Sequence, residues 1–230
     1  MKIDRALIIR RLGVESSIEY ANMCAESCEK HDLNYEFIDG IEFMSSDEAF
    51  NAVGVWKRPE YIGTTGHNNC HASHIKAWKR IIELEKACLI LEHDAVVMGN
   101  VKNIDIPDMA AITFGHRIGT LNRYKPIGPI TSLVQLPKTI GVHACGLTPV
   151  TATYLYEDAY KNGVGENVDK FLFMEGSSGL HIYATDPPQV VCWPRFSTRE
   201  FVDQEKRTGT MGSTWNYTDG VAPSWKLGIR

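Results

Sequence analysis

The alternation of apolar and polar positions predicts strands and helices in turn along the first third of the chain. ALIIRRL, from Ala6 onward, is a short apolar run that predicts a buried strand. SSIEYANMCAESCEKHD follows with helix-like spacing, and Ser16 or Ser17 is the expected N-cap. NYEFIDGIEF alternates and then turns at Asp39-Gly40, which is typical of the end of a strand. A loop-rich region is expected from there to Gly66.

The remainder of the chain continues the same pattern. A long helical pattern precedes ACLILEHDAVVM, which is apolar enough to be a central strand. MAAITFG and GVHACGLTP predict further strands, and VTATYLYEDAYKN predicts a helix. RIGTLNRYKPIGPITSLVQLP, irregular and rich in Gly and Pro, predicts a loop or a strand-poor excursion. Residues 187–230 predict a wrapping tail. We therefore expect an α/β domain with a mostly parallel central sheet flanked by helices.

Composition limits the classes of protein that fit. The chain has 230 residues, 43% of them hydrophobic, enough for a sizeable core. No apolar run approaches the roughly 20 residues of a membrane span. The start, MKIDRALIIRRLG, places charge on both sides of a very short apolar run, so we expect no signal peptide and a cytoplasmic protein. The six cysteines are scattered and are expected to be free thiols.

Charge is distributed unevenly along the sequence. The net charge of −4 argues against general affinity for nucleic acid. Residues 109–156 nevertheless contain no Asp or Glu, and they include Arg117, Arg123, Lys125 and Lys138. A basic segment on an acidic chain suggests a local anionic ligand, although a solvated loop that arose by chance explains the same pattern.

Three histidines and a cysteine fall within the eight residues HNNCHASH. His67, Cys70, His71 and His74 are spaced i, i+3, i+4, i+7, so they share one face of a helix that begins near residues 65–66. The same face continues through Trp78, which makes it the side that packs on the core. Inward-facing histidines near a helix N-terminus would line a polar pocket suited to an anion, although an ordinary core histidine is the alternative for each.

Zinc is the other chemistry that this stretch suggests. At 1.5 Å per residue, His67 and His74 lie about 10 Å apart along the helix axis, so one helix cannot surround an ion with four ligands. Two ligands at i, i+4 could contribute, with the remainder coming from elsewhere. A histidine-rich zinc-binding protein therefore stays an alternative rather than the expected function.

Acidic residues end the most apolar predicted strand. Ligands of parallel α/β sheets gather at the carboxyl ends of strands, where Glu92 and Asp94 would both approach one divalent ion. Oxygen ligands favour Mg²⁺ or Mn²⁺ over zinc. The competing interpretation is a strand-to-turn junction with solvated acids.

Taken together, CHASHIKAWKRIIELEKACLILEHDAVV resembles the core of glycosyltransferase family 25, the lipooligosaccharide and collagen galactosyltransferase group. Members typically show Cys-x-x-Ser-His-x-x-x-Trp on a helix and then a strand that ends Leu-Glu-Asp-Asp. The middle Asp of that ending is His93 in this chain. ALIIRR, FIDGIE, VHACGLTPVTATYL and ENVDKFL resemble other parts of the family in order. The positions that match the two core motifs are Cys70, Ser73, His74, Trp78, Leu91, Glu92 and Asp94.

The resemblance implies a fold and a reaction. It implies a GT-A-like nucleotide-sugar-binding domain over residues 1–199, with residues 200–230 as its C-terminal tail. It implies a metal-dependent, inverting hexosyltransferase that uses a UDP-sugar, with Glu92 and Asp94 holding Mn²⁺ or Mg²⁺ on the donor diphosphate. The residues that would bind the donor are Ile9, Arg10, Asp39, Ser73, His74 and Glu92.

Catalysis and acceptor binding are expected from other segments. Asp169 is the candidate base on the acceptor hydroxyl, with His74 as a second catalytic residue. The alternative role for Asp169 is a helix N-cap. His143 and Asp186 are weaker candidates for the base.

Arg117, Arg123 and Lys125 would bind an anionic acceptor. A lipooligosaccharide-type glycan, as in lipopolysaccharide biosynthesis, is favoured over a hydroxymethylated DNA base, because DNA-acting enzymes usually need a wider basic surface. A non-catalytic nucleotide- or carbohydrate-binding module remains the other alternative.

Overall fold

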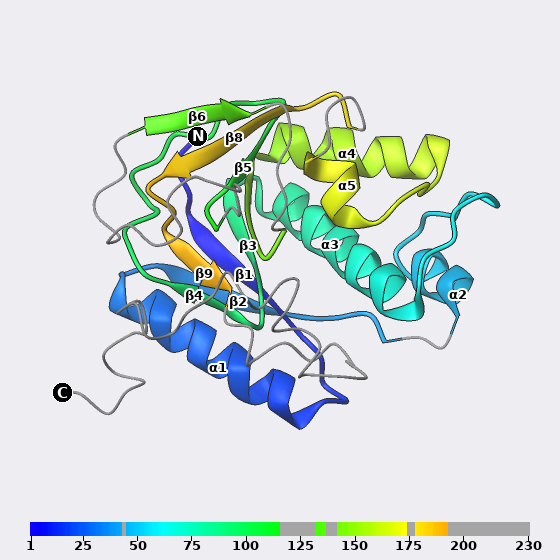
Figure 1. Ribbon diagram of the computed structural model, residues 1–230, viewed down its shortest axis with the longest axis horizontal. Helices are drawn as coiled ribbons and strands as arrows, with labels where there is room; N and C mark the ends of the chain where they lie inside the picture. Colours follow the sequence, from blue (N-terminus) through cyan, green and yellow to red (C-terminus); the bar gives the residue numbers. More distant parts are fainter. Residues whose placement is uncertain (43–44, 116–131, 137–141, 174–177, 193–230) are drawn as a thin grey trace, which may run out of the picture.

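A computed structural model describes residues 1–42, 45–115, 132–136, 142–173 and 178–192 of the chain. Within these ranges the molecule is a mixed α/β structure with one large sheet and a small second sheet (Figure 1). The basic segment 117–125 and the tail from residue 193 lie outside the described residues. No helix in the described ranges combines the length and the apolar character needed to cross a membrane.

Seven strands form the large sheet, in the order β2–β1–β3–β7–β5–β8–β6. The pairs β1–β2, β1–β3 and β5–β8 are parallel, whereas β7 and β6 run antiparallel to their neighbours. Five strands therefore share one direction, which confirms the predicted α/β class with a mostly parallel sheet. The strands are β1 (Arg5–Arg10), β2 (Asn34–Asp39), β3 (Cys88–Glu92), β5 (Ala110–Thr113), β6 (Ser132–Leu136), β7 (Ala144–Leu147) and β8 (His181–Asp186).

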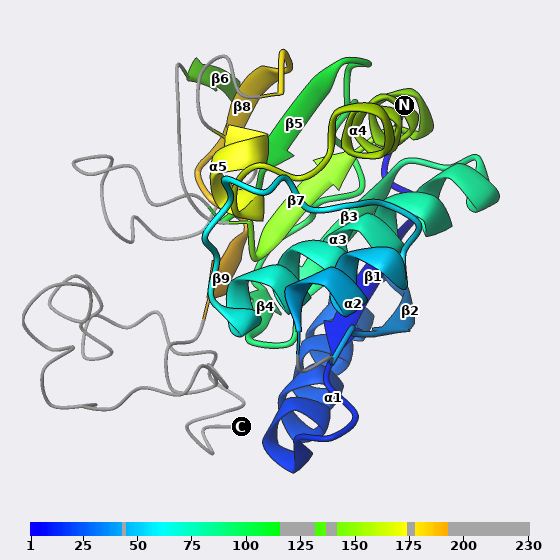
Figure 2. The same ribbon diagram turned by 90° about the vertical axis from the view of Figure 1, so that its right-hand side faces the viewer.

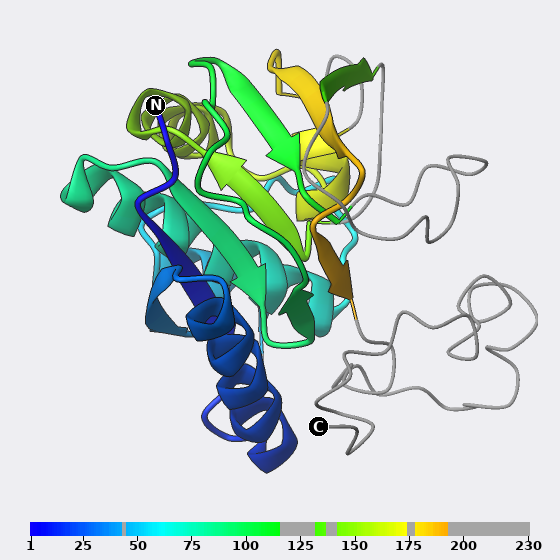
Figure 3. The same cartoon turned by 90° about the vertical axis from the view of Figure 1, so that its left-hand side faces the viewer.

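Helices cover both faces of the sheet. One face carries α1 (Glu15–Lys30), and the other carries α3 (Thr65–Leu84), α4 (Pro149–Asn162) and α5 (Val168–Phe173), as Figures 2 and 3 show from opposite sides. The short α2 (Ser46–Asn51) lies against α3.

Strand residues feed the two cores in alternation because successive side chains point to opposite faces. Leu89 and Leu91 of β3 join the core under α1, whereas Cys88 and Ile90 join the core under α3. This explains why the sequence of β3 is a continuous apolar run.

Two predicted elements differ from the structure. ACLILEHDAVVM is not one strand: β3 ends at Glu92, residues 93 and 94 turn, and β4 (Ala95–Val97) pairs instead with β9 (Val190–Cys192) in the small sheet. An apolar run cannot reveal which partner satisfies its backbone hydrogen bonds. The segment predicted as an irregular loop contains β6, which pairs antiparallel with β8 at the edge of the large sheet.

Helix starts follow local hydrogen bonding more closely than residue type. The N-cap of α1 is Val14, not Ser16 or Ser17. The Ser17 hydroxyl is buried and accepts instead from the backbone N–H of Arg11 at 2.9 Å. The predicted start of α3 is confirmed, with Thr64 as the N-cap that accepts from the N–H of His67. The histidine-bearing face of α3 is thus placed as the spacing predicts.

Candidate functional site

The parallel strands β2, β1 and β3 end at one edge of the sheet. Arg10 is in register with Asp39, and Ile9 is in register with Glu92, so these four predicted donor-binding residues lie together. The Arg10 Nε donates to Asp39 Oδ1 at 2.8 Å, and its guanidinium lies 4.3 Å from the centre of the Phe37 ring. The ion pair and the ring hold a positive charge at the carboxyl edge, where α/β sheets bind ligands.

Helix α3 brings Ser73 to the same edge. The Ser73 hydroxyl accepts from the N–H of Ile41 at 2.8 Å and donates to the carbonyl of Asn69 at 2.6 Å. A Cβ at Gly40 would lie 3.2 Å from the Ser73 oxygen, so the chain after β2 passes close against the helix. Ser73 therefore joins the end of β2 to α3, a contact that the sequence motif alone does not show.

Glu92 points to the α3 side, where Cys70 and His74 meet it. The Cys70 thiol donates to Glu92 Oε1 at 3.2 Å, and His74 Nε2 lies 3.4 Å from the same oxygen. The three ligand atoms are all within 4.8 Å of one another. His74 is fully buried, whereas the Glu92 side chain is 18% exposed. Among the described residues, this is the group of three with metal-ligating chemistry.

The turn that follows β3 places the next two side chains near α1. The His93 ring stacks on Tyr20 of α1, with ring centres 6.5 Å apart. Asp94 is buried, and its charge contributes, after burial itself and the neighbouring Cys28, to raising the pKa of the Cys24 thiol. Glu92 thus meets Cys70 and His74 on the α3 side, whereas Asp94 acts on Cys24 of α1.

His71 is a core histidine and does not line a polar pocket. Its ring lies among Phe50, Trp78 and Phe171, and its Nδ1 is 2.9 Å from the carbonyl oxygen of Glu166. Burial lowers the pKa of His71 to about 3, so the ring is neutral at pH 7 and its Nδ1–H donates to that carbonyl. The expectation of an anion pocket lined by several histidines is wrong for His71, because aromatic side chains fill the space around it.

A hydrogen bond from the backbone before β7 to the Asp169 side chain places Asp169 near the end of β3. Its Oδ1 accepts from the N–H of Val142 at 3.0 Å, and the neighbouring carbonyl of His143 accepts from the N–H of Glu92 at 3.0 Å. Asp169 is not the N-cap of α5: the Asn167 side chain accepts from the N–H of Lys170 and fills that role. The half-buried carboxylate therefore lies at the edge where β3 ends.

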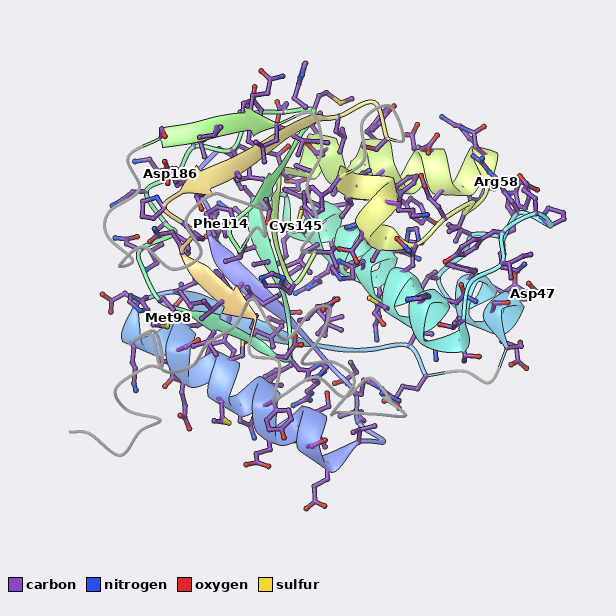
Figure 4. The ribbon with its side chains drawn as sticks, in the orientation of Figure 1. Asp47, Arg58, Met98, Phe114, Cys145 and Asp186 are labelled. Atoms are coloured by element: carbon purple, nitrogen blue, oxygen red, sulfur yellow. The ribbon has the colours of Figure 1, made fainter. Side chains whose placement is uncertain are left out.

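The two weaker candidates for the base differ in position. His143 is buried at the start of β7, directly beside the end of β3. Asp186 is exposed at the end of β8, separated from β3 by β7 and β5, and Figure 4 shows it far from Arg58 and Asp47 on the side of α2. Arg117, Arg123 and Lys125, expected at the acceptor, lie outside the described residues.

The contact of Cys70 with Glu92 is not predicted by the sequence. The pattern places Cys70 on the histidine face and in the family motif, but it assigns no role to the thiol. The i, i+4 spacing to His74 was the available signal, since it sets two ligand atoms on one helix face. The third member, Glu92, comes from the next strand, and only the packing of α3 on β3 shows that they meet.

A known protein family matches the segment that carries most of these residues. Residues 14–112 match the model of glycosyltransferase family 25 (LPS biosynthesis protein), somewhat less than half of the chain. Over these residues the chain is similar to glycosyltransferase family 25, as its core motifs predict. A comparison with curated proteins gave no match. A crystal structure of a glycosyltransferase involved in the glycosylation of the major capsid of PBCV-1 is similar at 14% sequence identity, with 68% of each chain covered and a TM-score of 0.36.

The glycosyltransferase family 25 match contains most of the clustered residues. Asp39, Ser73, His74, Glu92 and Asp94 all fall within residues 14–112. Ile9 and Arg10 precede the matched segment, and Asp169 follows it. The family resemblance is thus confirmed for the helix–strand core, and the roles of all these residues remain predictions.

Proposed function

We propose that this protein is a family 25 glycosyltransferase that moves a hexose from a UDP-sugar to a hydroxyl group of an anionic acceptor, in a metal-dependent, inverting reaction. The observation that carries the proposal is the position of Glu92. It ends β3 inside the family-matched segment, at the carboxyl edge shared with Arg10 and Asp39. A ligand at that edge would meet a fixed cation, carboxylates and the backbone after β2.

The donor would lie along this edge. In the proposal, the Arg10 guanidinium, held by Asp39 at 2.8 Å, faces the charged part of the nucleotide, and Ile9 lies beneath it. Ser73 keeps the backbone after β2 in place through its contact with Ile41. Preorganised groups of this kind lose little freedom on binding, which favours affinity.

A divalent ion suits the residue types at the end of β3. Glu92 and Asp94 supply the oxygen ligands that Mn²⁺ and Mg²⁺ prefer, provided that one of the two carboxylates turns toward the other. Such an ion would offset the charge that develops on the departing diphosphate. His74 is fully buried beneath Glu92, so we assign it to orienting that carboxylate rather than to direct contact with the donor.

The proton of the acceptor hydroxyl needs a base. We propose Asp169, because one of its carboxylate oxygens is fixed by the N–H of Val142, two residues from the β7 end of the β3–β7 pair. Its second oxygen would accept the proton. The acceptor itself is assigned to Arg117, Arg123 and Lys125 by their charge alone, with an anionic glycan favoured over hydroxymethylated DNA.

The test is release and transfer of sugar by the full chain. UDP-galactose and UDP-glucose are incubated with Mn²⁺, with Mg²⁺ or with a chelator, and free UDP is measured. We expect turnover that needs the ion and that falls at least 100-fold in Glu92→Gln and in Asp94→Asn. Glu83→Gln, an exposed acid near the far end of α3, is the matched control and should keep full activity.

Two results would contradict the proposal. Unchanged turnover in Asp94→Asn would remove Asp94 from the metal site. Tight UDP binding without any hydrolysis or transfer, across a panel of sugars and acceptors, would indicate a non-catalytic binding module instead. Comparing the salt dependence of turnover on a polyanionic and on a neutral acceptor then tests the basic segment.

A further inference from the structure

We propose that Cys70, His74 and Glu92 form a binding site for one thiophilic divalent cation, of which Zn²⁺ is the natural example. The site is distinct in chemistry from the oxygen-ligated ion of the proposed transfer reaction, although both would use Glu92. This proposal rests on the positions of the three side chains and is independent of the proposed transfer reaction.

The distances fit a tetrahedral ion. Zinc lies about 2.0–2.3 Å from nitrogen, oxygen and sulfur ligands, so neighbouring ligand atoms in a tetrahedron are roughly 3.3–3.8 Å apart. The observed separations are 3.2 Å from Cys70 Sγ to Glu92 Oε1 and 3.4 Å from His74 Nε2 to the same oxygen. All three atoms lie within 4.8 Å of one another. Side-chain shifts of at most about 1 Å would therefore complete three corners.

The ligands come from two elements that the core holds in place. Cys70 and His74 are one helical turn apart on α3, and Glu92 ends β3, a strand that is otherwise fully buried. His74 is fully buried and Glu92 is 18% exposed, so the cluster reaches solvent on the Glu92 side. Three protein ligands would leave the fourth position of a tetrahedral ion to water or a substrate, as in catalytic zinc sites.

Ligand type separates this site from a magnesium or manganese site. A thiolate and an imidazole are soft or borderline ligands that favour zinc, cobalt and copper, whereas Mg²⁺ prefers oxygen. A cysteine thiolate and a glutamate carboxylate together carry two negative charges, which a divalent cation neutralises. The buried side of the cluster is therefore left without net charge.

Binding would rearrange two protons. Cys70 would lose its thiol proton to solvent as Sγ bonds to the ion, and His74 would carry its proton on Nδ1 so that Nε2 can ligate. Among the described residues, His74 Nδ1 has no hydrogen-bond partner. Zinc-bound histidines usually donate that proton to a carbonyl or carboxylate, which strengthens binding. We therefore expect an affinity weaker than that of structural zinc sites and rising with pH.

Cobalt titration of the full chain tests the site directly. Tetrahedral Co²⁺ bound to a thiolate gives a sulfur-to-cobalt charge-transfer band, and its visible absorption reports geometry. We expect one Co²⁺ per chain with that band, displaced by Zn²⁺ and absent in Cys70→Ser. Cys88→Ala is the matched control, because Cys88 is a buried thiol at the opposite end of β3 and should leave the band unchanged.

Each outcome decides between binding at this cluster and binding elsewhere. A charge-transfer band that persists in Cys70→Ser, or no thiolate band in the wild-type protein, would overturn the proposal. Glu92→Gln should weaken Co²⁺ binding at least tenfold while keeping the thiolate band. Circular dichroism of each variant checks that the fold is intact. No sugar nucleotide is present in the titration, so a failed transfer assay leaves this result unaffected.

Discussion

The backbone N–H of Glu92 donates to the carbonyl oxygen of His143 at 3.0 Å, and this bond fixes the end of β3 against the start of β7. His143 in turn lies against Gly115, where any Cβ would collide with the imidazole and come within 2.8 Å of the Val190 carbonyl oxygen. The position of Glu92 therefore depends on a glycine more than twenty residues away in the sequence.

Gly115→Ala should lower stability and disturb the site together. The methyl group must displace the His143 ring or the Val190 backbone, and overpacking of this kind costs about 1–3 kcal/mol. Urea unfolding measures the loss. Gly66→Ala is the control: its nearest new neighbour would be 4.0 Å away, and alanine favours a helix, so stability should be unchanged or higher. Equal stability of the two variants would show that the contact with His143 is not rigid.

Ser73→Ala should weaken donor binding through the backbone that follows β2. The change leaves the N–H of Ile41 without its acceptor, which costs about 1–3 kcal/mol when the group stays away from water. We expect a raised KM for the UDP-sugar with a smaller change in kcat. Steady-state kinetics measures both. Ser16→Ala, on the partly exposed side of α1, should leave both constants unchanged; a fall in kcat alone would instead give Ser73 a direct role in catalysis.

Acid should destabilise the protein through His71. Its pKa is about 3 in the folded state because the ring is buried, against about 6.5 when unfolded, so the unfolded state binds more protons between these values. This contribution is complete above pH 6.5 and is lost as pH falls, by up to about 1.4 kcal/mol per pH unit.

Urea unfolding at pH 7.5 and pH 5 tests this effect. His71→Phe keeps the ring contacts with Phe50 and Trp78 and should show a much shallower pH dependence than the wild type. His31, half-buried with a pKa also lowered by burial, acts in the same direction but more weakly, so His31→Gln should change the slope only slightly. A slope that stays the same in His71→Phe would assign the acid sensitivity to other groups.

Zinc should inhibit the transfer reaction if both proposals hold. An ion held by Cys70, His74 and Glu92 would occupy the carboxylate that the Mn²⁺-dependent reaction needs. We expect Zn²⁺ to slow UDP-sugar turnover in the presence of Mn²⁺, a chelator selective for zinc to restore it, and Cys70→Ser to resist inhibition. Equal inhibition of the wild type and Cys70→Ser would place the inhibitory ion at another site.

Much of the fold could be predicted because the signals are local. The apolar run of β3, the turn after Asp39 and the face of α3 each follow from side-chain periodicity within a few residues. The break at residues 93–94 could not be predicted, because it depends on β9 offering backbone partners from a hundred residues away. The strand β6 was missed for the same reason, since β8 forms its ladder.

The candidate site could likewise be predicted only in part from the sequence. Glu92, Arg10 and Asp39 could be brought to one edge from sequence, because parallel strands end together. Cys70 and His74 could be placed on one helix face. Sequence could not show that Glu92 leans toward that face while Asp94 lies near Cys24 of α1, because the turn between them decides the direction of each side chain.

The five cysteines whose side chains the structure describes differ in access to solvent. Cys24, Cys28, Cys88 and Cys145 are buried, and burial raises the pKa of Cys88 to about 12, whereas Cys70 is partly exposed. Thiolates, not thiols, react with electrophiles, and burial disfavours the thiolate. Among these five cysteines, iodoacetamide should therefore alkylate the partly exposed Cys70 fastest. The rate of its alkylation should therefore fall whenever a metal or a nucleotide shields the sulfur. Alkylation of Cys70, measured by mass spectrometry, would thus report whether a ligand is bound beside His74 and Glu92, even when the substrate is not known.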